Sequence, residues 1–372
     1  MNDNRYERWM TADGSELEGA LTRLEVAATP EPGEDEGFWI LAEKLYLRQR
    51  LLLRNSGPSQ DTAGEAELAQ HRALFATHRT ELALFPSELL SLDARYERAC
   101  MVDHIECIHL MSLQERTPGQ TRLLQLLVKR LWAYIQNANV DANGLAFHAD
   151  LLLTLARSAH NINFGAAIAE IAYKRGPKRL TSVYLCMWCL FLLQQCEWHT
   201  AWKLSSRQLK HNGFSLHLAA IKLVSVLAPL TLRHDRDMLQ KGYRLSPFMV
   251  PSLETLSRLF LAQIEKRLVT AFEDGSGLLL CAYALLCRNY YPQRLKALRA
   301  QLREFQPGLS PEFALLVVTQ ELLLTCQELS REDWTEVRAL ASQFMAENRH
   351  PEDLWSRAQL DVLSLLTAKG DA

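Results

Sequence analysis

The sequence predicts an all-α protein in which antiparallel helical hairpins stack on one another, with extra helices at the N-terminal end. Apolar residues recur at a spacing of three to four along most of the chain, whereas few stretches alternate with a period of two. The 372 residues include only 16 Gly and 13 Pro, too few for a large β or loop-rich protein. An apolar fraction of 48% is ample for a core and excludes wholesale disorder.

The pattern divides the chain into three parts: an acidic N-terminal segment (1–36) with a short helix, an N-terminal helical region (37–140) and a hairpin region (141–372). Polar loops rich in Gly, Pro or Asn separate the helices of the first two parts. Pro86 suits the first turn of a helix, where its missing N–H costs nothing. The helices expected before residue 141 span 16–28, 38–54, 65–78, 86–116 and 121–136.

After Gly144 the expected helices become shorter and paired, with breaks such as Gly176-Pro177 and Asn212-Gly213 between them. Helices of this length joined by short loops pack antiparallel to their neighbours. Region 141–372 is therefore expected to be a series of helical hairpins. The helices expected there span 146–160, 164–175, 181–195, 198–211, 214–228, 235–244, 251–272, 278–288, 293–305, 311–328, 332–347 and 352–367.

A spacing of 34 residues links the aromatic and small residues of two hairpins. Phe164 and Ala167 recur as Trp198 and Ala201, and Trp334 lies four further periods after Trp198. The spacing resembles the tetratricopeptide repeat, a helix–turn–helix unit of 34 residues with an aromatic at the start of its second helix and a small residue three positions later. The resemblance covers about a quarter of the chain and implies an α-solenoid in which these five residues pack the repeats. Another solenoid or an irregular helical bundle is the alternative.

The helix expected at 181–195 is apolar on almost every side, which predicts burial on every side. Either neighbouring helices cover it, or it lines a groove that binds an apolar partner segment. In the second case Cys186, Leu190 and Leu193 are the candidate lining residues.

The net charge of −2 hides a strong asymmetry along the chain. Residues 1–36 and 304–372 each carry a balance of −7, whereas 174–303 carry 20 Lys and Arg against seven Asp and Glu. The basic segment is either a solvated helix surface or a surface for an acidic peptide, a nucleic-acid backbone or the chain's own acidic ends. Its candidate partner-binding residues are Arg294, Lys296, Arg299 and Arg303.

The sequence contains no motif for catalysis, for a cofactor or for phosphate binding: neither a Walker A loop nor GxGxxG, HExxH or GxSxG is present. Cys186 and Cys189 form a CxxC inside an apolar helix, which indicates core cysteines. Cys100, His104 and Cys107 share one helix face and could hold zinc with a fourth ligand, but packing is the favoured interpretation. No metal and no cofactor are predicted.

These observations predict a non-enzymatic protein that binds a protein or a peptide segment, as an adaptor, a chaperone-like holder or a regulatory partner. The alternative function is a nucleic-acid-binding regulator that uses the basic band 174–303. No secretory signal opens the sequence, and the longest apolar runs, 185–193 and 278–287, are about half the ~20 residues of a membrane span. Cysteines placed in apolar helices are typical of reduced thiols, so a cytoplasmic protein without a membrane span is expected.

Overall fold

The computed structural model shows a helical protein whose chain divides into two compact units. Unit 1 comprises Met1–Leu155 and Lys174–Arg179, and unit 2 comprises Ala156–Tyr173 and Leu180–Ala372. No strand occurs among the residues that the structure describes, so the predicted all-α class is confirmed. The described residues are 14–26, 35–54, 73–82, 84–85, 91–113, 115–241, 250–268, 277–291 and 354–370, with the single positions 294, 335 and 339.

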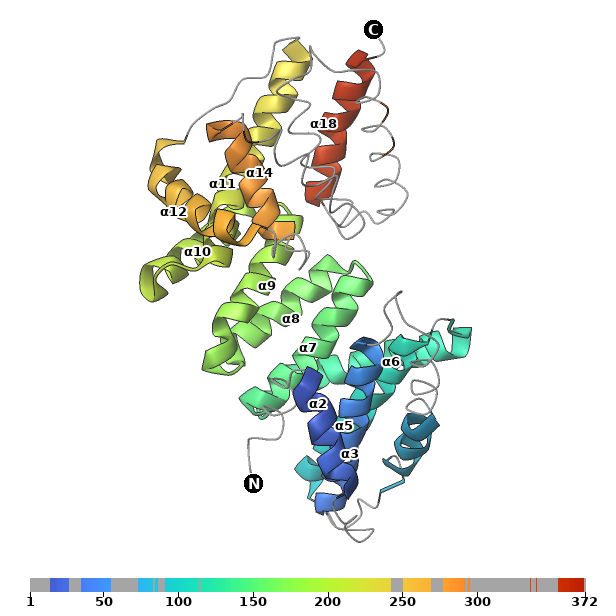
Figure 1. The fold of residues 1–372 in the computed structure, drawn as a ribbon. Helices are drawn as coiled ribbons and strands as arrows, with labels where there is room; N and C mark the ends of the chain where they lie inside the picture. The colour runs from blue at the N-terminus through green and yellow to red at the C-terminus, as the bar shows by residue number, and fades with distance from the viewer. Residues whose placement is uncertain are drawn as a thin grey trace. The chain divides into compact units, whose positions relative to one another are not determined.

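Unit 1 is built from helices, several of them about 20 residues long (Figure 1). Its helices include α2 (Gly14–Val26), α3 (Asp35–Arg54), α5 (Leu92–Ser112), α6 (Pro118–Gln136) and most of α7 (Ala142–Ser158). A further helix covers 73–82.

Two capping residues fix the boundaries of α5 and α6. The Ser91 hydroxyl accepts a hydrogen bond from the Ala94 N–H, and the extended backbone of Ser91 starts α5 there. The predicted single helix over 86–116 is therefore interrupted at Ser91 and ends early, since α5 spans Leu92–Ser112, while Pro86 and the rest of 86–90 lie outside the described residues. Thr117 and Gln120 form a reciprocal capping box, with Pro118 in the first turn of α6.

The acidic N-terminal segment is not independent of the helices that follow it. Its helix α2 packs on α3 through Leu21 and Leu24, which contact Leu47. The Arg48 guanidinium also donates to the Glu25 carboxylate. The charge boundary at residue 36 therefore falls inside a packed helical pair. The second predicted boundary, at residue 140, lies before α7, whereas the compact division falls within α7 after Leu155.

Unit 2 is organised around the long helix α11 (Leu216–Lys241), which among the described helices contacts α9 (Thr181–Gln194), α10 (Trp198–Asn212), α12 (Glu254–Ile264), α14 (Gly277–Tyr290) and α18 (Leu354–Gly370). Figure 1 shows α10, α12 and α14 beside it. The core cluster draws on most of these helices and contains, among others, Leu193, Ala201, Val224, Phe260 and Leu280. The described part of the unit also contains α8 (Ile162–Arg175, through Tyr173).

Helix α11 continues through Pro229, where the sequence predicted a break between 228 and 235. A proline inside a helix removes one backbone hydrogen bond. Ala228 before Pro229 is buried, and buried Thr231, Asp235 and Leu239 follow it at helical spacing, so tertiary packing holds the helix together. The helix predicted over 251–272 is divided in turn into the 3₁₀ turn Pro251–Leu253, α12 and the 3₁₀ turn Glu265–Arg267.

Among the described helices, α11 alone has the length and apolar composition to cross a membrane. Helices in the cores of soluble proteins have the same composition, and 56% of its most apolar window is buried in the structure. Its buried residues belong to the core cluster of unit 2.

The residues that carry the 34-residue spacing are not buried alike. Ala201 has no exposed surface and Trp198 packs against the core cluster, with its ring edge-on to Trp355 at 5.5 Å between centroids. Phe164 and Ala167 are only partly buried. The close approach in the earlier hairpin occurs at Gly165, which lies against the Phe191 ring of α9. Trp334 lies outside the described residues. The tetratricopeptide-like arrangement itself remains a prediction.

Enlarging the two alanines tests whether their positions are equivalent. Ala201→Trp is expected to lower the free energy of unfolding by at least 1–3 kcal/mol, because a fully buried site has no room for an indole. Ala167→Trp is expected to cost less, since that site is partly open. Urea unfolding of both variants measures the difference. Equal losses would mean that the two sites are equally packed, and no loss for Ala201→Trp would contradict the repeat assignment.

A buried ion pair joins α11 to α14. Both nitrogens Nη1 and Nη2 of Arg288 donate to the Asp235 carboxylate, with an Nη1–Oδ2 distance of 2.7 Å. The side chains of Arg288 and Asp235 are 0% and 1% exposed. Beside them the Asn289 amide donates to the Thr231 hydroxyl at 3.2 Å. This polar layer crosses an otherwise apolar interface and fixes the register of the two helices.

Candidate interaction surface on helix α10

The solvent-facing side of α10 is basic and aromatic. Its inner side carries Ala201 and Ser205, which are fully buried, and the partly buried Trp198, Leu204 and Leu209, which pack on the core cluster. Helical periodicity then places the remaining positions outward. We call the outward set the α10 face: His199, Trp202, Lys203, Arg207, Lys210 and His211, all of them exposed.

An aromatic stack lies at the N-terminal end of the α10 face. The rings of His199 and Trp202 stack with 5.7 Å between centroids and 30° between planes. Trp202 is 38% exposed, which is high for an indole in a helix that packs on a core. The stack presents a flat, polarisable surface to solvent.

Three cations follow the stack along the helix. Lys203, Arg207 and Lys210 are four and three residues apart, which places them roughly 6 Å and 4.5 Å apart along the axis. None of the three forms an ion pair within the described part of the chain. Lys210 and His211 lie in the last turn, where they also complement the helix dipole.

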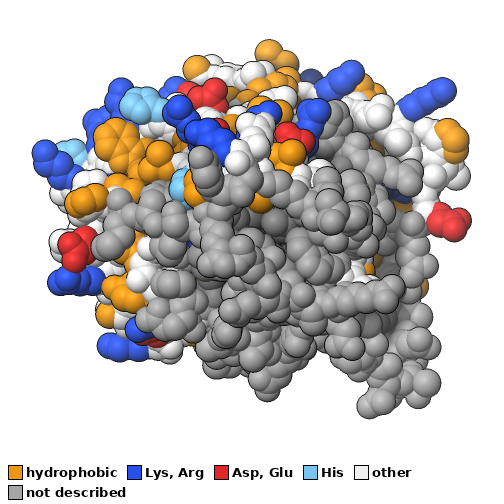
Figure 2. Space-filling view, turned by 90° about the horizontal axis from the view of Figure 1, so that it is seen from above, with side chains coloured by type: hydrophobic (Ala, Val, Ile, Leu, Met, Phe, Trp, Pro, Cys, Tyr) orange, Lys and Arg blue, Asp and Glu red, His pale blue; other side chains and the backbone are white. Residues whose placement is uncertain are grey.

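Acidic residues are scarce around the α10 face. Helix α10 contains none, and the stretch 171–234 holds nine Lys and Arg but only one acid, Glu197, at the N-terminal cap of α10. On the face drawn in Figure 2, Lys, Arg and His side chains stand among apolar ones in the described part of the surface. Such a surface attracts anionic partners, and salt in the medium screens that attraction.

The proposed lining of an apolar groove on α9 is only partly available. Leu193 has no exposed surface and belongs to the core cluster, so it is corrected from a lining residue to a core residue. Cys186 is partly buried against the same cluster, whereas Leu190 is 38% exposed. Val183, seven positions before Leu190, is also exposed. Positions seven residues apart share one helix face, so Val183 and Leu190 leave a small exposed apolar strip on α9.

The predicted basic group after α14 is described only at Arg294. Its guanidinium donates to the Glu265 carboxylate and lies 5.0 Å from the centre of the Tyr291 ring. Both contacts occupy Arg294 within unit 2, which leaves less of it for a partner. Lys296, Arg299 and Arg303 lie outside the described residues. In unit 1, Arg175 donates to the carbonyls of Ile135, Gln136 and Asn137 at the end of α6.

Three buried cysteines of the described helices are poorly suited to metal binding or nucleophilic chemistry. Burial raises the pKa of Cys100, Cys107 and Cys189 to about 12, so these thiols stay protonated at neutral pH. The described residues hold no group of three or more His, Cys, Asp and Glu side chains that could bind a metal ion. The core interpretation of Cys100, His104 and Cys107 agrees with their complete burial.

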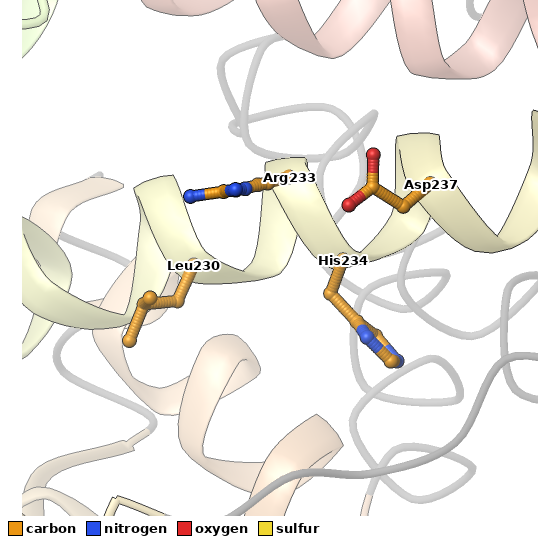
Figure 3. Close-up of a pocket in the computed structure, with 4 residues that line it drawn as sticks. All are labelled: Leu230, Arg233, His234 and Asp237. Carbon is orange, nitrogen blue, oxygen red and sulfur yellow. The ribbon is translucent and has the colours of Figure 1, made fainter.

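An open depression of about 310 Å³ lies beside α11 and is lined by Leu230, Arg233, His234 and Asp237. Figure 3 shows that all four come from this one helix, with Leu230 and His234 directed to one side of it. Side chains from a single helix do not converge on a point, so this depression lacks the arrangement of an active site.

Sequence reasoning named the basic band but missed the α10 face within it. A signal was available: the stretch from Trp198 to Asn212 has no acid, and its polar positions share one helical face. The stack of His199 on Trp202 follows from their spacing of three, but their exposure required the structure. Comparisons with models of protein families, with curated proteins and with solved structures found no match to this chain.

Proposed function

We propose that the chain is a non-enzymatic interaction protein of the cytoplasm that binds an acidic segment of another protein through the α10 face. The observation that supports this proposal best is the combination of an exposed His199–Trp202 stack with three cations that form no ion pair among the described residues, on one helix that lacks acids. An aromatic platform supplies apolar contact area, and the cations supply charge complementarity and fast association. Stacked helical hairpins of the tetratricopeptide type would hold this face rigid.

Charge reversal on the α10 face is the direct test. Arg207→Glu combined with Lys210→Glu is expected to weaken binding of a fluorescent Asp- and Glu-rich peptide by roughly tenfold or more, since two attractions become repulsions. The matched control is Arg122→Glu with Lys129→Glu on α6, which changes the net charge equally at exposed positions. Fluorescence anisotropy at ~0.1 M salt measures both. Equal weakening by both pairs, or no weakening by the first, would contradict the assignment to the α10 face.

Single-stranded nucleic acid is the second candidate partner, favoured by the position of the aromatic stack beside the row of cations. Bases stack on exposed aromatic rings while Lys and Arg follow the phosphates. A salt titration with a random single-stranded oligonucleotide separates the two candidates. One outcome is that the oligonucleotide binds more tightly than the acidic peptide at ~0.15 M salt, with a steep salt slope that the Arg207 and Lys210 changes reduce. In that case nucleic acid replaces the acidic segment as the proposed partner of the α10 face.

A further inference from the structure

Two histidines form a buried pair between α5 and α7 in unit 1. His104 of α5 and His148 of α7 are 2% and 0% exposed. Their Nδ1 atoms are 3.0 Å apart, the distance of a hydrogen bond. The pair joins two helices through side chains that titrate near neutral pH when they are exposed to water.

The hydrogen bond sets the protonation state of both rings. One ring must donate its Nδ1–H and the other must accept at Nδ1, so the neutral pair contains two different tautomers. A first additional proton can enter only at Nε2 of the donor ring, where it buries a positive charge. A second proton would occupy the accepting Nδ1, set two N–H groups against each other and break the link.

The described rings that pack on the pair are uncharged. The His104 ring stacks on Phe147 at 4.2 Å, and Tyr134 of α6 and Tyr46 of α3 pack against the two histidines. On α5 itself, Cys100 and Cys107 share the face of His104 and keep protonated thiols. The carboxylate of Asp103 on α5 pairs with Arg130 of α6 at 2.9 Å. Burial lowers the pKa of both histidines, that of His148 to about 3, and no carboxylate acts in the opposite direction.

We propose that the His104–His148 pair is an acid-sensitive latch that holds α7 on α5 and releases it when the pH falls below the normal range of histidine. Both rings are neutral in the folded unit, while in the unfolded chain each takes a proton near pH 6.5. The latch therefore stabilises the packing of α7 on α5 fully above pH 6.5. This stabilisation is lost as the pH falls from 6.5 toward 3.

The expected size of the pH effect on opening follows from two protons, which the open state binds and the folded unit excludes. Between pH 6 and pH 5 they raise the equilibrium constant for opening of α5 and α7 by roughly 60-fold. Asp103 acts in the other direction, because burial raises its pKa to about 6 and the folded unit takes up a proton there. The difference between the wild type and a variant without the two histidines isolates the contribution of the latch.

Hydrogen exchange of the whole chain, pulsed at one common pH after incubation at pH 6 or pH 5, tests the proposal. In the wild type, opening of α5 and α7 is expected to increase more steeply with acid than in His104→Asn/His148→Asn, by roughly 60-fold per pH unit, because asparagine keeps a hydrogen-bonding amide but does not titrate. His211→Asn on the exposed side of α10 is the control and should behave as the wild type. Equal pH dependence in the double variant and the wild type would overturn the proposal.

A second measurement needs no variant. In ¹⁵N-histidine-labelled wild type at neutral pH, a nitrogen–nitrogen coupling across the hydrogen bond should join two neutral rings, one protonated at Nδ1 and the other at Nε2. The same two rings should still lack a positive charge at pH 5.5. A missing coupling, identical tautomers, or a cationic ring at pH 5.5 would each overturn the latch.

Discussion

Replacing Arg288 with methionine is expected to lower the free energy of unfolding of unit 2 by roughly 3–5 kcal/mol. The change leaves the Asp235 carboxylate 1% exposed and without its bidentate partner, inside the interface of α11 and α14. Desolvation of an unpaired charge outweighs any gain from the more apolar side chain. Urea unfolding at pH 7, followed by circular dichroism, measures the loss.

Removing both charges together is the matched control for this prediction. Asp235→Leu with Arg288→Met replaces the ion pair by apolar side chains of similar size, and the combined loss should be well below that of Arg288→Met alone. A double variant that is as unstable as the single one would show that Arg288 acts through packing of its aliphatic stem rather than through its charge.

The pH dependence of Arg288→Met adds a signature of the stranded carboxylate. Burial raises the pKa of Asp235, and the Arg288 guanidinium opposes that rise in the wild type. Without the guanidinium the folded state takes up a proton more readily than the unfolded state does, so acid favours the folded variant. The cost of Arg288→Met should therefore shrink between pH 7 and pH 5. A cost that grows with acid would contradict this account.

Gly165→Ala is expected to destabilise unit 2 by roughly 1–3 kcal/mol, although alanine normally favours a helix. A Cβ atom at position 165 would lie 2.3 Å from Cζ and 2.4 Å from Cε1 of the Phe191 ring. That ring is only 4% exposed, so it cannot move aside into solvent. Either α8 must move away from α9 or the ring must leave its rotamer, and both cost packing energy.

Two further variants separate the clash from the general effect of alanine. Gly119→Ala in the first turn of α6 meets nothing closer than 3.9 Å and should be neutral or slightly stabilising. Phe191→Leu in the Gly165→Ala background removes ring atoms from the clash and should restore part of the loss. Thermal unfolding of the set measures these differences. If Gly165→Ala behaves like Gly119→Ala, the close contact of α8 with α9 at Gly165 and Phe191 is contradicted.

The periodicity of the sequence was sufficient to predict the class and many helices. The helices expected at 181–195 and 198–211 agree closely with α9 (Thr181–Gln194) and α10 (Trp198–Asn212), because loops flank both segments, and the first is a continuous apolar run while the second has strong helical periodicity. The prediction failed at Pro229 and at Ser91 for opposite reasons. At Pro229 tertiary burial overrides a local helix breaker, and at Ser91 a local cap starts a helix in the middle of a periodic pattern.

The sequence by itself determined an all-helical chain with an acid-poor middle, since both follow from residue type and spacing along one segment. Only the tertiary structure decided which side chains meet: His104 with His148, Asp235 with Arg288, and Gly165 with Phe191. It also decided that Leu193 is buried while Trp202 faces solvent. The physical reason is that helical periodicity fixes which residues share a face, whereas the neighbour of that face comes from a segment far away in the sequence.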